Sequence, residues 1–185
     1  MNTELKLHLG CGDRRLPGFI NIDIRKTKAV DLTADISKDL PFEEGSVDLI
    51  YSCANIEHFG RHEWVKIITN WFKLLKPGGV LRLSTADFRS VCEDYIERGN
   101  IEQLLGFVVG GQKNNYDWHG MVFDFELLNR ELKKIGFEKI ERYDWSKTSH
   151  CDVDDYSSAY LPHMDKENGK LMMLNIEATK NKEQE

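Results

Sequence analysis

Apolar residues recur along the chain with two different periods, and these periods predict an alternation of strands and helices. Short apolar runs and apolar-polar alternation predict strands at residues 5–9, 19–24, 30–34, 47–52, 80–85, 139–145 and 171–179. Apolar residues spaced three or four apart predict helices at residues 62–76, 88–97, 100–109 and 125–135. Strands that alternate with helices favour a mostly parallel sheet, so we expect an α/β fold.

Three connections between these elements are unusual. The first two strands are separated only by the segment from Gly10 to Gly18, which is shorter than the ~12 residues that a helical crossover between parallel strands needs. We therefore expect a clipped crossover with one helical turn. Residues 110–119 predict a loop over the open end of the sheet, and residues 146–169 predict a long polar loop, our candidate lid.

The composition is that of a globular chain without a membrane span. Of its 185 residues, 41% are hydrophobic and 30% are charged, and the apolar runs are far shorter than the ~20 residues that cross a bilayer. The first residues lack the basic and apolar regions of a signal peptide, so we expect a cytoplasmic protein. We expect one domain over residues 1–180 and a frayed charged tail over residues 181–185.

The charge of the chain bears on its binding partners, and the spacing of its cysteines bears on metal sites and disulfides. The net charge is −6 and the Lys and Arg residues are scattered, so we expect no nucleic-acid partner and favour a small or uncharged one. The four cysteines have no CxxC spacing, which favours free thiols over a zinc site or a disulfide framework. The oligomeric state is left open.

Two glycines follow the first predicted strand. Gly10 and Gly12 flank Cys11, and the absence of Cβ atoms allows both a tight turn and the close approach of a ligand. We interpret this turn as a nucleotide-type cofactor loop; the alternative is an ordinary strand-to-loop turn. An NAD-binding motif fits poorly, because position 15 is Arg15 and the next acid, Asp23, follows Gly12 by only 11 residues.

The order of short motifs resembles that of the class I S-adenosylmethionine-dependent methyltransferases. The motifs are His-Leu-Gly-Cys-Gly at 8–12, Asp23, Ala-Asp-Ile at 34–36, Leu-Pro-Phe at 40–42, Val-Asp-Leu-Ile at 47–50, Ile-Glu-His-Phe at 56–59, Leu-Lys-Pro-Gly-Gly at 75–79 and Gly-Phe at 136–137. The resemblance spans residues 5 to about 145. It implies a Rossmann-like, mostly parallel seven-stranded sheet with an antiparallel last strand and shortened helices between the first three strands.

The first motif is most similar to that of small bacterial methyltransferases associated with sugar and cell-surface polysaccharide synthesis. The resemblance therefore implies S-adenosylmethionine as cofactor and a small-molecule or saccharide methyl acceptor. Two alternatives are a non-catalytic, methyltransferase-like binding module and, less favoured, an NAD-dependent oxidoreductase.

The resemblance also implies a set of cofactor-binding residues near the carboxyl ends of the strands. The set is Gly10, Cys11, Gly12, Asp23, Asp35, Ile36, Ser52, Cys53 and Ala54. The glycines would lie under the methionine and ribose part, and Asp23 would accept hydrogen bonds from the ribose hydroxyls. Asp35 would accept from the adenine amine, Ile36 would pack on the ring, and residues 52–54 would line the sulfonium end.

The chain departs from the family's fuller first motif at two positions. His8 stands where the family has an acid, and Arg14 stands where it has a third glycine. Asp13 is a candidate to compensate in holding the methionine amine. The clipped crossover implies fewer backbone donors from a helix N-terminus.

Few catalytic residues are expected, because the cofactor is already activated for methyl transfer. His119 is the candidate base, since imidazole titrates near neutral pH, and Asp117 is the candidate that orients it. The alternative for His119 is a hydrogen-bonded loop histidine that packs against Trp118. Glu57 and His58 are candidates to position the acceptor or to cap the following helix.

Aromatic residues in the predicted loops are candidates for acceptor contacts. Trp118 and Tyr156 lie among polar residues, where exposed rings suit stacking on a sugar or a planar group. The alternative is that these rings only pack the loops. No metal is expected: His58 and His62 are four residues apart, but Gly60 interrupts the helical register and a catalytic site needs three protein ligands.

Overall fold

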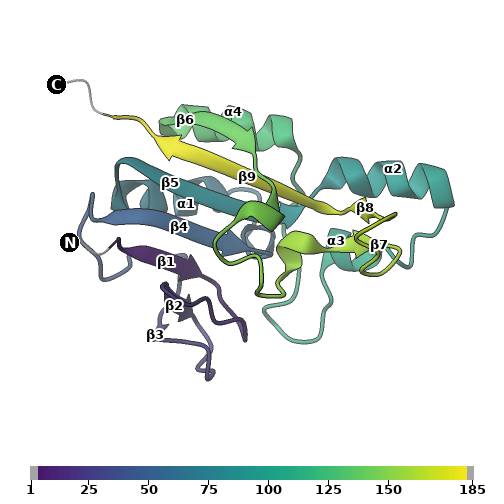
Figure 1. Ribbon diagram of the computed structural model, residues 1–185, viewed down its shortest axis with the longest axis horizontal. Coiled ribbons are helices and arrows are strands. Elements are labelled where there is room, and N and C mark those ends of the chain that lie inside the picture. The colour runs from purple at the N-terminus through teal and green to yellow at the C-terminus, as the bar shows by residue number, and fades with distance from the viewer. Residues whose placement is uncertain (1–3, 183–185) are drawn as a thin grey trace.

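A seven-stranded sheet forms the centre of the computed structural model, which describes residues 4–182 (Figure 1). Its strands are β1 (Lys6–Leu9), β2 (Ile20–Asp23), β3 (Leu32–Thr33), β4 (Val47–Cys53), β5 (Leu75–Ala86), β6 (Phe137–Arg142) and β9 (Met173–Lys180). They lie in the order β3-β2-β1-β4-β5-β9-β6, and β9 runs antiparallel to both of its neighbours. The predicted mostly parallel sheet with an antiparallel last strand is confirmed.

The sheet register brings the apolar residues of neighbouring strands together. Leu7 pairs with Ile20 and Ile50, and Leu9 pairs with Ile22, all within the parallel part of the sheet. Leu7, Leu9, Ile22 and Ile50 have no exposed surface. Near-continuous burial of this kind is typical of parallel strands that are covered on both faces.

Helices α1 (Trp64–Leu74) and α4 (Phe125–Ile135) pack their apolar stripes into the same core (Figure 1). In α1 the buried residues are Trp64, Ile67, Ile68, Trp71 and Leu74, spaced three or four apart as a helix against a sheet requires. The prediction of α4 is confirmed at both ends. Its N-cap Asp124 accepts from the amide of Leu127, and Gly136 ends it in the left-handed conformation.

Two further helices lie at the end of the sheet where β5 finishes (Figure 1). Helix α2 (Phe88–Arg98) begins at the predicted residue, where the Asp87 side chain caps it by accepting from the amide of Arg89. Helix α3 (Leu105–Val109) is shorter than the predicted 100–109.

The predicted helical turn between the first two strands is wrong. Residues 10–19 form turns, as do residues 24–31. The Asn21 side chain supplies the hydrogen bonds that a helix would have made. Its amide nitrogen donates to the carbonyls of Leu16 and Phe19, and its oxygen accepts from the amide of Leu16.

Strand β5 begins earlier than predicted, directly after α1. Leu75 pairs with Val47, and after a register shift Val80 pairs with Leu49. Gly79 permits this approach, because a Cβ there would lie 3.0 Å from the carbonyl oxygen of Val47. The Leu-Lys-Pro-Gly-Gly motif is therefore an irregular start of a strand.

The predicted loop at residues 146–169 contains short elements. Two 3₁₀ turns, η2 (Trp145–Lys147) and η3 (Tyr156–Ser158), and strand β7 (Tyr160–Leu161) interrupt it. Strand β7 pairs antiparallel with β8 (Lys170–Leu171), outside the main sheet. Within this segment, η3 packs against β5 and β9.

The helices α1, α2 and α4 each have 11 residues, and within residues 4–182 no helix is long and apolar enough to cross a bilayer. Of the predicted tail, residues 183–185 lie outside the described part of the chain. A single domain over residues 1–180 stays a prediction.

Candidate active site

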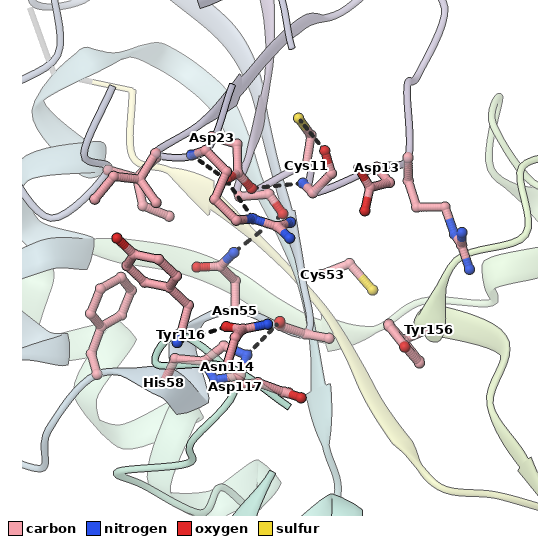
Figure 2. Close-up of a pocket in the computed structure, with 18 of the residues that line it drawn as sticks. Cys11, Asp13, Asp23, Cys53, Asn55, His58, Asn114, Tyr116, Asp117 and Tyr156 are labelled. Carbon is pink, nitrogen blue, oxygen red and sulfur yellow. Dashed lines mark hydrogen bonds and ion pairs between the residues drawn. The ribbon is translucent and has the colours of Figure 1, made fainter. Parts of the chain in front are cut away.

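A cavity of about 650 Å³ opens beyond the carboxyl ends of β1, β2 and β4 (Figure 2). It is lined by His8, residues 10–14, 23–25, 35–37, 53–55, His58, Phe59, residues 113–118, Asp155 and Tyr156. The strand order reverses between β1 and β4, and ligands of open α/β sheets bind at such a reversal. The volume lies within the ~300–1,000 Å³ of small-molecule pockets.

The glycine turn forms part of this wall and leaves no room for side chains. Gly10 has φ +70° and Gly12 has φ +56°, a region that favours glycine. A Cβ on Gly10 would lie 1.4 Å from Nδ2 of Asn55, which donates to the Gly10 carbonyl at 3.3 Å. A Cβ on Gly12 would lie 2.9 Å from the Arg25 guanidinium.

Asp23, at the end of β2, is fixed against the glycine turn. One carboxylate oxygen accepts from the Gly12 amide at 2.7 Å, and the other accepts from the amide and Nε of Arg25 at 2.8 and 3.2 Å (Figure 2). The side chain is nearly buried, so its orientation is set before a ligand arrives.

Asp35 and Ile36 form the wall beyond β3. Asp35 accepts from the Ser37 hydroxyl and amide through Oδ1, at 2.6 and 2.9 Å, and the hydroxyl contact lowers the pKa of the carboxyl. Both bonds use Oδ1, which leaves Oδ2 for a ligand. The Ile36 carbonyl accepts from the Trp71 indole at 2.9 Å, so α1 holds this wall in place.

The end of β4 contributes two of its three predicted residues. Cys53 and Ala54 line the cavity, and burial raises the pKa of the Cys53 thiol, so it stays protonated near neutral pH. Ser52 is buried and donates to the carbonyl of Leu9 at 3.0 Å. It is not among the residues that line the cavity, and its role at the sulfonium end stays a prediction.

The two candidate histidines lie in different depressions. His58, in the 3₁₀ turn η1 (Ile56–His58), lines the cavity, with its ring nitrogens 3.1 and 3.2 Å from the carbonyl oxygens of Trp118 and Ala54. His119 lies behind it, with the ring centroids 4.9 Å apart, and lines a neighbouring depression. Burial lowers the pKa of His119.

The structure shows no hydrogen bond between Asp117 and His119, and an orienting role of Asp117 stays a prediction. Nδ1 of His119 lies 3.1 Å from the carbonyl oxygen of Phe107. The Asp117 carboxylate instead accepts from the amides of Gly111 and Lys113, at 3.3 and 3.2 Å, and so closes the loop on the cavity rim.

Glu57 connects η1 to the same loop through its backbone. Its carbonyl accepts from the amides of Gly120 and Met121 at 2.8 and 3.1 Å. Its side chain is buried and does not line the cavity, so a part in positioning the acceptor stays a prediction.

Three aromatic side chains stand at the rim of the cavity. Tyr116, Trp118 and Tyr156 line it while remaining 57%, 54% and 61% exposed. Figure 2 shows Tyr116 and Tyr156 on different sides of Cys53. Exposed rings at a polar cavity suit stacking against a flat or ring-shaped ligand.

No metal centre is formed by the described residues 4–182, where no three His, Cys, Asp or Glu side chains are grouped to hold an ion. All four cysteines are free, and Cys11 and Cys53 lie in the cavity wall.

The sequence of the chain matches one family model. Residues 16–83 match the family described as Methyltransferase domain, a region that starts after the glycine turn and ends in β5. The match covers less than half of the chain, and it supports a methyltransferase. No curated protein matches it by sequence.

Solved structures share the fold of this chain at low sequence identity. An S-adenosylmethionine-dependent methyltransferase from Thermotoga maritima has a TM-score of 0.60 and 17% identity, over 98% of this chain and 84% of the other. One from Methanosarcina mazei has 0.59 and 16%, over 99% and 95%. One from Archaeoglobus fulgidus has 0.60 and 12%, over 97% and 87%. The fold is therefore that of the class I enzymes.

S-adenosylmethionine is the cofactor that this family and fold imply, and the cavity fits it. The glycine turn lines it, and so do the carboxylates of Asp23 and Asp35, which can accept hydrogen bonds from a ligand. Every predicted cofactor residue except Ser52 lines this one cavity. The missing helix after β1 leaves fewer backbone donors than the fold usually offers.

The structure also has a buried polar cluster that pattern reasoning missed. Tyr51 donates to the Asp155 carboxylate at 2.5 Å, across 104 residues of sequence. The Tyr51 ring lies 5.3 Å from the ring of His8 and 4.5 Å from that of His150. Strand alternation places His8, Tyr51 and Cys53 on one face, but no local signal shows that the segment after β6 returns to cover it.

His150 makes the stability of the protein depend on pH. Burial lowers its pKa to about 4 from an ordinary 6.5, so the unfolded chain binds more protons than the folded one between these values. We expect stability to be complete above pH 6.5 and to fall by up to about 3 kcal/mol as the pH drops to 4. Urea unfolding midpoints measured from pH 7.5 to pH 4 test this.

The control for the His150 effect is His150→Phe, which keeps an aromatic ring but cannot be protonated. Its stability should depend less steeply on pH than that of the wild type. Identical slopes for the two proteins would assign the acid sensitivity to other groups.

Proposed function

We propose that this methyltransferase transfers a methyl group from S-adenosylmethionine to a small-molecule or saccharide acceptor bound at the aromatic rim. The observation that carries the proposal is the continuity of the cavity. One space joins the glycine turn and the two acids to the rim residues Tyr116, Trp118 and Tyr156. Cofactor and acceptor can therefore meet inside it.

The bound cofactor supplies an activated methyl group on a sulfonium. The task of the chain is to hold the acceptor atom about 3–3.5 Å away and in line with the bond that breaks. Asp23 and Asp35 fix one end of the cofactor through its ribose and adenine. Cys53 and Ala54 then face the sulfonium end, on the side of the cavity from which the acceptor approaches.

The rim favours a polar, ring-shaped acceptor such as a sugar. Aromatic faces stack against the C–H face of a sugar ring, while Asn114, Asn115 and the backbone of the 110–118 loop offer partners for hydroxyl groups. The likeness of the first motif to sugar-pathway methyltransferases supports the same choice. A nucleic-acid acceptor is not part of the proposal, and the cytoplasm stays the predicted location.

An acceptor hydroxyl or amine loses a proton during transfer. We retain His119 as the candidate base, although it lines the neighbouring depression and not this cavity. Its ring centroid lies 4.9 Å from that of His58, which does line the cavity. In this proposal Asp117 orients His119 indirectly. Its carboxylate accepts from the amides of Gly111 and Lys113 and so holds the conformation of the loop that carries His119.

A non-catalytic binding module is the second candidate. It is favoured by the missing helix after β1 and by the Asn55 and Arg25 side chains that cover the glycine turn. The two candidates differ in one readout: only the enzyme releases S-adenosylhomocysteine when cofactor and a panel of sugars and sugar nucleotides are supplied together.

Cofactor binding is tested with Asp23→Ala. We expect S-adenosylhomocysteine at 100 times its Kd to stabilise the wild type by about 2.7 kcal/mol. Loss of the ribose contacts and of the support for the Gly12 amide should weaken binding by roughly ten- to a hundredfold. Titration calorimetry and thermal melting measure both effects.

The matched control is Asp39→Ala, since Asp39 is an exposed acid outside the cavity. Its affinity should equal that of the wild type. A wild type that neither S-adenosylmethionine nor S-adenosylhomocysteine stabilises would overturn the proposed function.

A further inference from the structure

Both ring nitrogens of His58 face backbone carbonyl oxygens. Nδ1 lies 3.1 Å from the oxygen of Trp118, and Nε2 lies 3.2 Å from the oxygen of Ala54. A carbonyl oxygen only accepts hydrogen bonds, and a neutral imidazole carries a single N–H. A neutral ring therefore makes one of these two bonds and turns a lone pair towards the other oxygen. Only the doubly protonated ring makes both bonds.

The neighbouring histidine needs only one proton. The ring centroids of His58 and His119 lie 4.9 Å apart, and Nδ1 of His119 lies 3.1 Å from the carbonyl oxygen of Phe107. A neutral ring with its proton on Nδ1 makes that bond. Burial lowers the pKa of His119, and the adjacent His58 lowers it further. The hydrogen bonds of the pair are therefore complete when His58 is charged and His119 is neutral.

Negative charge lies next to this pair. Glu57 is 2% exposed, and Oε2 of its carboxylate has no hydrogen-bond partner within residues 4–182. Glu57 and Asp117 both act electrostatically on His119. A buried carboxylate is stabilised when a positive charge lies nearby, and a charged His58 supplies one. The other ionisable groups that line the cavity or the depression from the end of β4, the 110–118 loop and the segment after η1 are the protonated thiol of Cys53, Lys113, Tyr116 and Arg61.

The two carbonyls belong to different parts of the cavity wall. Ala54 follows β4, lines the cavity and has φ +49°, a conformation that residues with a Cβ rarely adopt. Trp118 ends the 110–118 loop and places its ring at the rim. The backbone carbonyl of Glu57 already attaches η1 to the residues that follow this loop. The ring of His58 extends that attachment to Trp118 and holds the unusual backbone of Ala54.

We propose that His58 is a positioning residue whose doubly protonated ring ties the end of β4 to the acceptor rim at Trp118. Loss of one proton breaks one of the two hydrogen bonds and loosens the rim against the cavity wall. The rim is thus held at low pH and released as the pH rises through the titration of His58. The consequence for acceptor binding rests on the proposed function, whereas the coupling between His58 and Trp118 does not.

The test observes Trp118 without any ligand. Protein labelled with 5-fluorotryptophan gives one fluorine resonance for each of its four tryptophans, and Trp118→Phe assigns that of Trp118. Nitrogen-15 NMR of the histidine rings follows the protons on His58 from about pH 5 to about pH 9, around the ordinary titration of histidine. We expect the Trp118 resonance to shift with the same midpoint at which His58 loses a proton. In His58→Phe, which has no ring proton to lose, that shift should be absent.

Two control variants locate the proton. His62→Phe is the same substitution at an exposed residue of the same segment, outside both depressions, and should leave the coupling unchanged. His119→Phe should also retain it, because the carbonyl of Trp118 faces His58. Coupling that is lost in His119→Phe and kept in His58→Phe would assign the effect to His119. His58→Gln, which cannot gain a charge, is the second variant if His58→Phe does not fold.

Two results in the wild type would overturn the role of His58. One is a Trp118 resonance that does not follow the titration of His58, and the other is a His58 ring that stays singly protonated down to about pH 5. With an acceptor that is turned over, KM for that acceptor should rise about tenfold across the same pH interval, as for a lost hydrogen bond to a charged group. The Kd of S-adenosylhomocysteine should stay unchanged. If no acceptor is methylated the proposed function fails, while the NMR measurements still decide the role of His58.

Discussion

Gly10→Ala is expected to abolish measurable cofactor binding and to destabilise the fold. The new Cβ would lie 1.4 Å from Nδ2 of Asn55, so that side chain must leave its place over the turn. The residue must also keep φ near +70°, which costs roughly 1–2 kcal/mol for a residue with a Cβ. Thermal melting and titration with S-adenosylhomocysteine measure the two losses separately.

Gly45→Ala separates backbone strain from steric exclusion. Gly45 has φ +68° and nothing within 4 Å of its would-be Cβ, and it lies outside the cavity. This control should lose a similar amount of stability and bind cofactor as the wild type does. Equal binding by Gly10→Ala and Gly45→Ala would show that the turn does not face the cofactor.

Trp71→Ala is expected to cause the largest loss of stability among single substitutions in α1. Trp71 has no exposed surface, and removal of a buried tryptophan costs about 3–5 kcal/mol. The substitution also takes the indole donor from the carbonyl of Ile36, which lines the cavity on the side where we propose that adenine binds. We therefore expect a lower melting temperature together with weaker cofactor binding, as measured by urea unfolding and calorimetry.

Trp118→Ala is the matched control for Trp71. The Trp118 side chain is 54% exposed and lines the rim, so its loss should change stability by less than about 1 kcal/mol. Cofactor affinity should stay near the wild-type value, since this ring is assigned to the acceptor. A loss of stability as large as that of Trp71→Ala would contradict this division of roles.

Local patterns predicted the parts of the structure that local forces determine. The apolar stripe of α1, the starts of α2 and α4, and the glycine turn after β1 depend on residues only a few positions apart. The motif resemblance placed Asp23 and Asp35 near one another, and both line the cavity.

Contacts between distant segments escaped prediction for a physical reason. Tyr51 and Asp155 meet because the segment after β6 folds back over the sheet, and neither residue has a local signature of that contact. The Asn21 side chain donates hydrogen bonds to the segment between β1 and β2, where we predicted a helical turn. The periodicity of apolar residues carries no signal for such contacts. His119 was chosen by residue type and loop position, while the direction of its ring depends on the carbonyl of Phe107.

Strand β9 lies between β5 and β6 in the sheet but follows both in the sequence, so the sheet can be completed only late in translation (Figure 1). Residues 173–180 must leave the ribosome before β6 can join the sheet, because β6 pairs with β9. The same strand anchors the cavity wall near Asp155, since the Asn175 amide donates to the carbonyl of Ser157 at 2.9 Å. A nascent chain that has emerged only as far as α4 can form the glycine turn but not the wall opposite it, so we expect cofactor binding to arise late and abruptly in translation.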